Sequence, residues 1–158
     1  MSYTKRIGVF PGSFDPITLG HEDIVLRSLS LFDEVIIAIG TNSAKNYMFS
    51  LEQRMQMIND VFAHESRVKV ETFTGLTADY CRSKNINYIL RGLRTSSDFE
   101  FERAIGQMNK AMFSELETVF YLSDPRLSAI NSTIVRDILK NGGNAKQFLP
   151  QKLDLSNY

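Results

Sequence analysis

The chain has 158 residues, of which 43% are apolar and 23% are charged, a composition typical of one globular domain with a sizeable core. Its 18 basic and 18 acidic residues balance, which argues against a nucleic-acid-binding or membrane-surface protein, because such proteins carry a basic excess. A single cysteine, Cys81, excludes an internal disulfide and favours a reducing, cytoplasmic setting. No apolar run approaches the roughly 18 residues of a membrane span.

Short apolar runs alternate along the chain with segments of helical periodicity. Strands are predicted at Ile7–Phe10, Val35–Ile39, Val68–Val70, Tyr88–Leu90 and Val119–Leu122. Helices are predicted at Gly20–Leu31, Leu51–Ala63, Leu76–Lys84, Ser97–Phe113 and Ser132–Lys140. This alternation predicts an α/β fold, a single Rossmann-like doubly wound domain over residues 1–158 with a five-stranded parallel sheet. The tail, residues 151–158, has only a weak pattern.

Three predicted helices have an apolar stripe at helical spacing, which indicates amphipathic helices. The stripe of the first, residues 20–31, consists of Val25, Leu29 and Phe32 just after it. In residues 51–63 the stripe consists of Leu51, Met55, Ile58 and Phe62, and Ser50 and Gln53 before it have the spacing of a capping box. In residues 97–113 the stripe consists of Phe101, Ile105, Met108 and Met112. Ligands of doubly wound sheets bind at the carboxyl ends of the strands, so the candidate site is expected in the loops that follow the strands.

The loop after the first predicted strand has the sequence GVFPGSFDPITLGH, residues 8–21. Gly12 allows the backbone to approach a ligand, and Ser13 adds a hydroxyl. Gly20 and His21 lie where a helix begins, and the free N–H groups there favour an anion. Thr18 and His21 are three residues apart and can face each other across one turn. The loop matches neither the dinucleotide-binding nor the Walker A pattern, although His21 alone is equally consistent with a helix cap.

Two arginines, Arg91 and Arg94, flank Gly92 just after the fourth predicted strand. Arginine suits bidentate phosphate contacts, whereas isolated surface arginines usually form weak ion pairs, here with Asp98, Glu100 or Glu102. Two arginines at the carboxyl end of a strand, in a sheet whose first loop already suits an anion, favour a phosphate site.

The string GSFDPITLGH resembles the T/H-x-G-H signature of the nucleotidyltransferase superfamily. Lys45 after the second strand, RGLR at residues 91–94 with DFEFE at 98–102, and INSTIVR at 130–136 extend the resemblance over about residues 6–150. Together these motifs resemble the bacterial pantetheine-phosphate adenylyltransferases. The resemblance implies adenylyl transfer from ATP to 4′-phosphopantetheine, giving dephospho-CoA and pyrophosphate, the penultimate step of coenzyme A biosynthesis. It also implies Mg²⁺ accompanying ATP and a homohexamer.

The resemblance further implies site residues. It assigns catalysis to His21, Lys45 and Arg91, and the acceptor to Ser13, Lys45, Thr77 and Arg91. It assigns ATP to Ser13, Phe14, His21, Gly92, Leu93, Arg94, Glu102, Leu127, Ser128, Ala129, Ile130, Asn131, Ser132 and Thr133. Taken alone, Lys45 and Glu102 also fit solvated surface positions, and the stretch 127–133 also fits plain N-capping. Asn131, Ser132 and Thr133 stand where three serines are usual, and Ser13 stands where threonine is frequent.

Two other functions remain open from the sequence. One is a sister nucleotidyltransferase with another phosphorylated acceptor, such as nicotinate mononucleotide or glycerol phosphate; the RGLR block and Thr18, in place of a first histidine, argue against it. The other is a non-catalytic nucleotide-binding module, which the presence of His21, Lys45 and Arg91 together disfavours.

Overall fold

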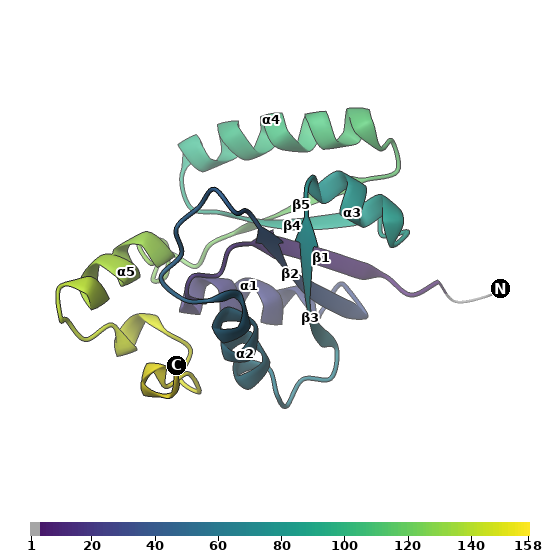
Figure 1. Ribbon diagram of the computed structural model, residues 1–158. Coiled ribbons are helices and arrows are strands. Elements are labelled where there is room, and N and C mark those ends of the chain that lie inside the picture. Colours follow the sequence, from purple (N-terminus) through teal and green to yellow (C-terminus); the bar gives the residue numbers. More distant parts are fainter. Residues whose placement is uncertain (1–3) are drawn as a thin grey trace.

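The computed structural model describes residues 4–158, in which all five strands form one parallel sheet in the order β3-β2-β1-β4-β5 (Figure 1). The strands are β1 (Ile7–Gly12), β2 (Glu34–Thr41), β3 (Val68–Thr74), β4 (Tyr88–Leu93) and β5 (Glu117–Leu122). The chain builds outward from β1 to β3 and then returns to the other side of β1. The strand order therefore reverses beside β1, where such sheets bind their ligands. The predicted five-stranded α/β fold is confirmed.

The strands are longer than predicted, mainly at their carboxyl ends. Pro11 pairs with Ala38 and Gly12 with Ile39, so β1 continues through two residues that are poor strand formers. The ladder between β2 and β3 likewise extends to Thr41 and Thr74. Tertiary pairing overrides local propensity here, and it brings polar residues to the edge of the sheet that holds the loops.

Helices cover both faces of the sheet (Figure 1). They are α1 (Leu19–Ser28), α2 (Leu51–Val61), α3 (Thr77–Ser83), α4 (Ser96–Met112) and α5 (Ser132–Lys140), followed by short 3-10 turns at Lys146–Phe148 and Leu155–Asn157. Helices α1 and α2 lie on one face and α3 and α4 on the other, while α5 and the C-terminal segment lie beside α2. The bounds of α5 agree with the prediction. Helix α1 ends three residues before its predicted end, because Leu31 and Phe32 turn back to bond the carbonyl of Ser28.

The core lies on both sides of β2. Val35, Ile37 and Ile39 pack with α1 and α2, whereas Ile36 and Ala38 pack with α3 on the opposite face. This alternation follows from the two-residue period of a strand. Full burial of each large aliphatic side chain contributes about 1.5–3 kcal/mol relative to exposure, so β2 is held firmly between the two helix layers and fixes the position of the loop that follows it.

Helix α2 has the predicted capping box, in which the Gln53 N–H donates to Ser50 Oγ at 3.2 Å and the Ser50 N–H donates to Gln53 Oε1 at 2.9 Å. Its most deeply buried face differs from the predicted stripe and consists of Arg54, Met57, Ile58 and Val61. Leu51 and Met55 are only partly buried at the margin of the core. A charged side chain therefore occupies a core position, with Arg54 only 3% exposed.

Helix α4 leaves its apolar stripe exposed. An amphipathic helix normally turns such a stripe toward the core, but here Phe101 is 67% exposed and Met108 is 64% exposed, and Ile105 and Met112 are also exposed. The helix packs on β5 through Gly106 instead, where a Cβ atom would lie 3.1 Å from Thr118 Oγ1. The stripe is therefore available to another surface.

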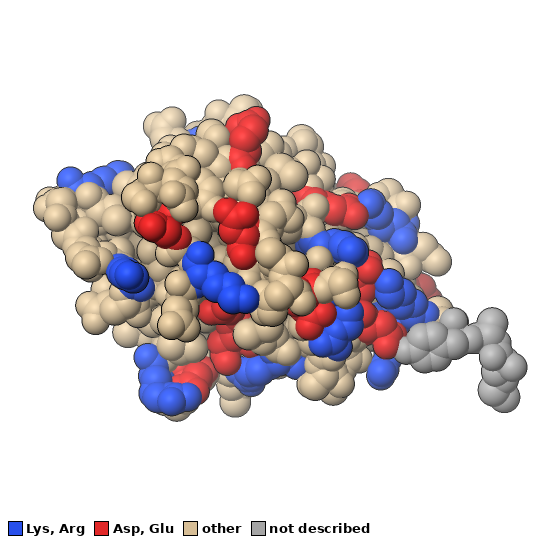
Figure 2. All heavy atoms as spheres, turned by 90° about the horizontal axis from the view of Figure 1, so that it is seen from below, with Lys and Arg blue, Asp and Glu red and all other residues tan. Residues whose placement is uncertain are grey.

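Basic and acidic side chains are interspersed on the face seen in Figure 2, in keeping with the net charge of 0. Within residues 4–158, no helix combines the length and the apolar character needed to cross a lipid bilayer.

Candidate active site

The loop after β1 forms a corner, residues 13–18, that is held by the last helix. Ser132 Oγ donates to the Pro16 carbonyl at 2.9 Å, and Arg136 Nη1 donates to the Asp15 carbonyl at 2.8 Å. The peptide between Asp15 and Pro16 is cis. Thr18 then begins α1 as its N-cap. The first and last helices therefore start side by side at this corner.

His21 lies in the first turn of α1 and is locked by its neighbours. Its Nδ1 accepts a hydrogen bond from the Thr18 backbone N–H at 3.0 Å, and its ring packs against Phe14 and Phe10, with centroids 5.0 and 6.0 Å away. Burial, followed by the charges of Arg91 and Arg94, lowers the pKa of His21 from 6.5 to about 4. The imidazole is therefore neutral at pH 7. Because Nδ1 accepts a hydrogen bond, the single N–H of the neutral ring is on Nε2, which can donate to a ligand.

Two cavities meet at the carboxyl end of the sheet. The larger has a volume of about 700 Å³ and extends across the ends of β1, β2 and β3 to α4. The smaller, of about 280 Å³, lies between the β1 corner, the end of β4 and the start of α5. Both are lined by Pro11, Gly12, Ser13, Arg91 and Glu102. Ligands bound in the two cavities would therefore meet beside Ser13 and Arg91.

Arg91 stands at this junction in a fixed orientation. Its guanidinium forms a two-pronged ion pair with Glu102, in which Nε lies 2.8 Å from Oε2, and its Nη1 donates to the Pro11 carbonyl at 2.9 Å. Glu102 is only 8% exposed. The ion pair considered from the sequence thus exists, but it leaves two of the five guanidinium N–H groups for a ligand. Glu102 orients Arg91 as well as lining both cavities.

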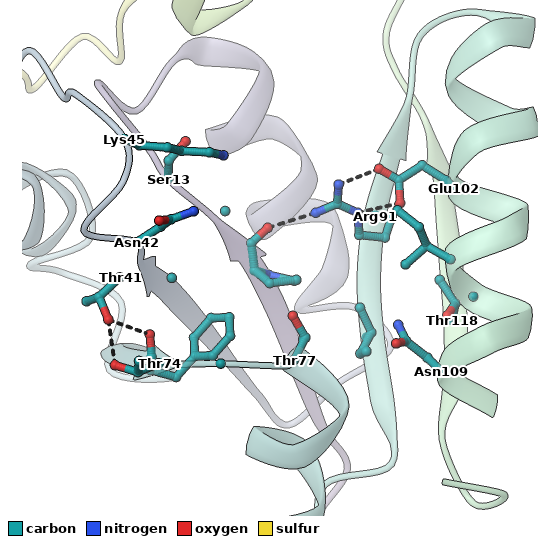
Figure 3. A pocket seen from close by; sticks show the side chains of 18 of the residues that line it. Ser13, Thr41, Asn42, Lys45, Thr74, Thr77, Arg91, Glu102, Asn109 and Thr118 are labelled. Carbon is teal, nitrogen blue, oxygen red and sulfur yellow. Dashed lines mark hydrogen bonds and ion pairs between the residues drawn. The ribbon is translucent and has the colours of Figure 1, made fainter. Parts of the chain in front are cut away.

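Lys45 approaches from the loop after β2. Figure 3 shows Lys45 and Ser13 on one wall of the larger cavity and Arg91 with Glu102 on the opposite wall, with Thr77 between them at the start of α3. Within residues 4–158, the Lys45 ammonium forms no ion pair. The cavity thus brings together a free lysine, a fixed arginine and a hydroxyl, a set suited to a phosphate group.

The structure brings most of the predicted residues together. All four residues predicted for the acceptor, Ser13, Lys45, Thr77 and Arg91, line the larger cavity. Of those predicted for ATP, the smaller cavity is lined by Ser13, Phe14, His21, Gly92, Arg94, Glu102, Leu127, Ile130, Asn131 and Ser132. Leu93, Ser128, Ala129 and Thr133 line neither of these two cavities. Thr133 instead lines a hollow of about 410 Å³ that also includes Ser13 and Lys45.

Two of the alternatives considered from the sequence are also present. Asn131 caps α5, since its Oδ1 accepts from the Ile134 N–H at 3.0 Å, and Arg94 pairs with Asp98, with Nε and Oδ2 3.2 Å apart. Both residues nevertheless line the smaller cavity. Capping and ligand binding use the same end of a helix, so one does not exclude the other.

Several residues of the larger cavity were not predicted from the sequence. Thr41, Asn42 and Thr74 lie at the carboxyl ends of β2 and β3, where correct strand ends would have revealed them. Asn109 and Thr118 come from α4 and β5 and meet only through tertiary packing. Arg54 lies outside this cavity and is buried, and its sequence signal is a charged residue within an otherwise apolar helical face.

A family model of cytidylyltransferase-like proteins matches residues 9–138. A solved structure, a bifunctional NMN adenylyltransferase/ADP ribose pyrophosphatase from Francisella tularensis, has the same fold, with a TM-score of 0.72 and 22% sequence identity over 95% of this chain and 46% of that one. Fold, family model and site define a nucleotidyltransferase.

Curated relatives identify the particular family. A phosphopantetheine adenylyltransferase from Christiangramia forsetii is 55% identical over 142 residues, covering 90% of this chain and 93% of the relative. Another from Flavobacterium johnsoniae is 52% identical and covers 92% of this chain and 95% of the relative. The chain belongs to the phosphopantetheine adenylyltransferases, and the family predicted from its motifs is confirmed.

Proposed function

We propose that this chain transfers the adenylyl group of ATP to 4′-phosphopantetheine, giving dephospho-CoA and pyrophosphate, the penultimate step of coenzyme A biosynthesis. The observation that carries the proposal is the junction of two cavities at Ser13 and Arg91. The larger cavity, with Lys45 and Thr77, takes the acceptor. The smaller, with His21 and Arg94, takes ATP. The reacting phosphates then meet where the cavities share a wall.

The nucleophile needs no general base. A phosphate monoester has its second pKa near about 6 and is mostly a dianion at neutral pH. The obstacle is repulsion between two anions, which positioning and charge overcome. Lys45 and Arg91 hold the acceptor phosphate and screen this repulsion, and Ser13 orients the attacking oxygen toward the α-phosphorus.

His21 stabilises the charge that develops on the α-phosphate. Its neutral ring offers the Nε2 hydrogen, and the Thr18 N–H fixes the opposite nitrogen as acceptor. A pKa of about 4 keeps the ring neutral at physiological pH, so His21 acts as a hydrogen-bond donor of fixed orientation. Arg94, Gly92 and the stretch 127–133 hold the nucleotide and the leaving pyrophosphate.

We propose that Mg²⁺ accompanies ATP, held mainly by phosphate oxygens and water, as is common for this ion. Within residues 4–158, no three His, Cys, Asp or Glu side chains form a group able to hold a metal ion. The nearby carboxylates are already engaged, Glu102 by Arg91 and Asp98 by Arg94. When bound, the ion supplies charge neutralisation to the polyphosphate.

We also propose assembly into a homohexamer. The exposed apolar stripe of α4 supports an interface between copies, because a contiguous apolar surface usually marks an interaction site. The variant Met108→Lys places a charge in this stripe and should lower the mass measured by light scattering. Leu26→Lys, at an exposed apolar position on α1, is the matched control and should leave the mass unchanged.

We also propose that residues 1–158 form a single nucleotidyltransferase domain and that the protein is cytoplasmic. The family model covers residues 9–138 of the chain. The lone cysteine, Cys81, is buried, and burial raises its pKa to about 12, so the thiol is unreactive.

A panel of acceptors tests the reaction. Pyrophosphate release is followed with ATP or CTP and with 4′-phosphopantetheine, nicotinate mononucleotide or glycerol phosphate as acceptor. Release is expected only with ATP and 4′-phosphopantetheine. Faster release with another acceptor would support a sister enzyme, and ATP binding without turnover on any acceptor would support a non-catalytic module.

The role of His21 has its own test. The variant His21→Ala should lower turnover sharply while the affinity for ATP measured by calorimetry changes little. Lost ATP binding with unchanged turnover of the bound complex would contradict a role in the transition state.

A further inference from the structure

Two buried charged side chains bind the backbone of the same residue, Phe49, one at its N–H and the other at its carbonyl. The carboxylate of Asp15 is 2% exposed and accepts hydrogen bonds from the backbone N–H groups of Met48 and Phe49, each at 2.9 Å. Arg54 is likewise buried, with only 3% of the residue exposed, and its Nε donates to the Phe49 carbonyl at 3.2 Å. Buried charges are costly unless they are fully hydrogen-bonded. Here backbone groups of the loop before α2 provide many of the bonds.

Arg54 also reaches the β1 corner. Its Nη1 donates to the Ser13 carbonyl at 2.8 Å, and its guanidinium carbon lies 4.0 Å from the centre of the Tyr47 ring. A cation stacked on an aromatic face at this distance is favourable, by up to about 2 kcal/mol when desolvated. The corner and the loop are thus linked twice. Asp15 of the corner holds the loop, and Arg54 beyond the loop holds the corner.

The position of Lys45 depends on this link. Residues 42–46 are exposed, and the bonds around Lys45 are local, from its own N–H to the Asn42 carbonyl at 3.1 Å and from the Ala44 N–H to Asn42 Oδ1 at 2.9 Å. Tyr47 is the first residue after this turn that contacts a buried side chain, since its ring stacks on the Arg54 guanidinium. The anchored segment therefore sets where the lysine stands relative to Ser13.

We propose that Asp15 and Arg54 are positioning residues, which hold the Lys45 loop against the β1 corner so that the Lys45 ammonium and the Ser13 hydroxyl reach the same acceptor phosphate. The inference rests on the proposed function. Neither side chain lines the larger cavity. Asp15 borders the hollow of about 410 Å³ beside it, but both of its carboxylate oxygens accept from backbone N–H groups, so both residues act through others. A displacement of about 1 Å at a reacting group can lower a rate about 100-fold, which makes such a link important for turnover.

The variant Arg54→Lys tests the inference in the full chain. Lysine retains the charge but loses the planar fork that reaches both Ser13 and Phe49. We expect kcat/KM for 4′-phosphopantetheine to fall about 10- to 100-fold, while the affinity for ATP measured by calorimetry changes little. In a Lys45→Ala background the same substitution should lower kcat/KM less than about threefold, because residues that act through one group are not additive.

The matched control is Arg67→Lys. Arg67 also braces a backbone carbonyl, with its Nη1 3.1 Å from the Leu29 oxygen, but it lies outside both cavities. The kinetics of Arg67→Lys should equal those of the unmodified chain.

The second test variant is Asp15→Asn. It keeps the shape of the Asp15 side chain but places an NH₂ group against one of its two N–H donors, Met48 and Phe49. It should show the same dependence on Lys45, and it decides the question if Arg54→Lys does not fold.

Equal losses with and without Lys45 would overturn the inference and leave Asp15 and Arg54 as purely structural residues. A fall in Tm with unchanged kcat/KM would do the same. If the unmodified chain transfers no adenylyl group to 4′-phosphopantetheine, the proposed function fails, and that result is distinct from a loss confined to the variants.

Discussion

The charge state of His21 leads to a prediction about pH. In the folded chain the pKa of His21 is lowered to about 4 by burial and then by Arg91 and Arg94, whereas its ordinary value is 6.5. Between these values the unfolded chain takes up a proton that the folded chain does not. The stabilisation is therefore complete above about pH 6.5, and it is lost progressively as the pH falls toward 4.

The size of the effect follows from the same two values. One pH unit corresponds to about 1.4 kcal/mol, so the interval from 6.5 to about 4 corresponds to roughly 3 kcal/mol of unfolding free energy. Part of the His21 side chain is exposed in the smaller cavity, so this figure is an upper value. It remains a large fraction of the stability of an ordinary domain, about 5–15 kcal/mol.

Two measurements check this reasoning. Imidazole NMR of a His64→Gln variant, in which His21 is the one remaining histidine of the sequence, should show no titration between pH 6 and 7. Denaturant unfolding at pH 7 and pH 4.5 should show a larger loss of stability for the unmodified chain than for His21→Asn, whose amide oxygen replaces Nδ1 as acceptor. A His21 resonance that titrates near 6.5 would refute the argument, as would equal losses in the two proteins.

Three further predictions concern other contacts. The variant Lys45→Ala should impair use of 4′-phosphopantetheine more than ATP binding, and equal losses would contradict its assignment to the acceptor. Glu102→Gln releases Arg91 from its ion pair, and kcat/KM for both substrates should fall about tenfold, the equivalent of one charge-assisted hydrogen bond; an effect on one substrate alone would show that Arg91 serves one cavity. In Gly92→Ala the new Cβ would lie 2.3 Å from Ile24 Cδ1, so chemical unfolding should show a loss of about 1–3 kcal/mol. Adding Ile24→Val removes that methyl and should restore most of it, whereas no recovery would exclude this clash as the cause.

The sequence predicted the fold well because its signals are local. The apolar run around Ile36 and Ile37 and the capping box at Ser50 are each encoded within a few residues. The bounds of α5 were predicted correctly for the same reason, since the Asn131 cap and the turn at Gly142 and Gly143 limit it on both sides. The end of β1 was placed too early because Pro and Gly extend a strand only when a partner strand pairs with them.

The site was predicted in part. The motifs located Ser13, Lys45 and Arg91, which the structure brings to one cavity. As a partner of Arg91, Glu102 was considered from the sequence only in a surface ion pair, whereas the structure shows it buried and fixing the orientation of Arg91 at the junction of the two cavities. The motifs did not predict that the apolar side chains of α4 face outward, since helical periodicity shows which residues share a face but not what that face contacts.

The corner at residues 13–18 carries a consequence for synthesis of the chain. Its carbonyl groups at Asp15 and Pro16 take their partners from Arg136 and Ser132, which lie 121 and 116 residues later. Contacts of such long sequence separation form slowly. The first loop of the protein can therefore reach its final shape only after the ribosome has released the last helix, and a nascent chain that stops before Ser132 would have a sheet without a finished phosphate pocket.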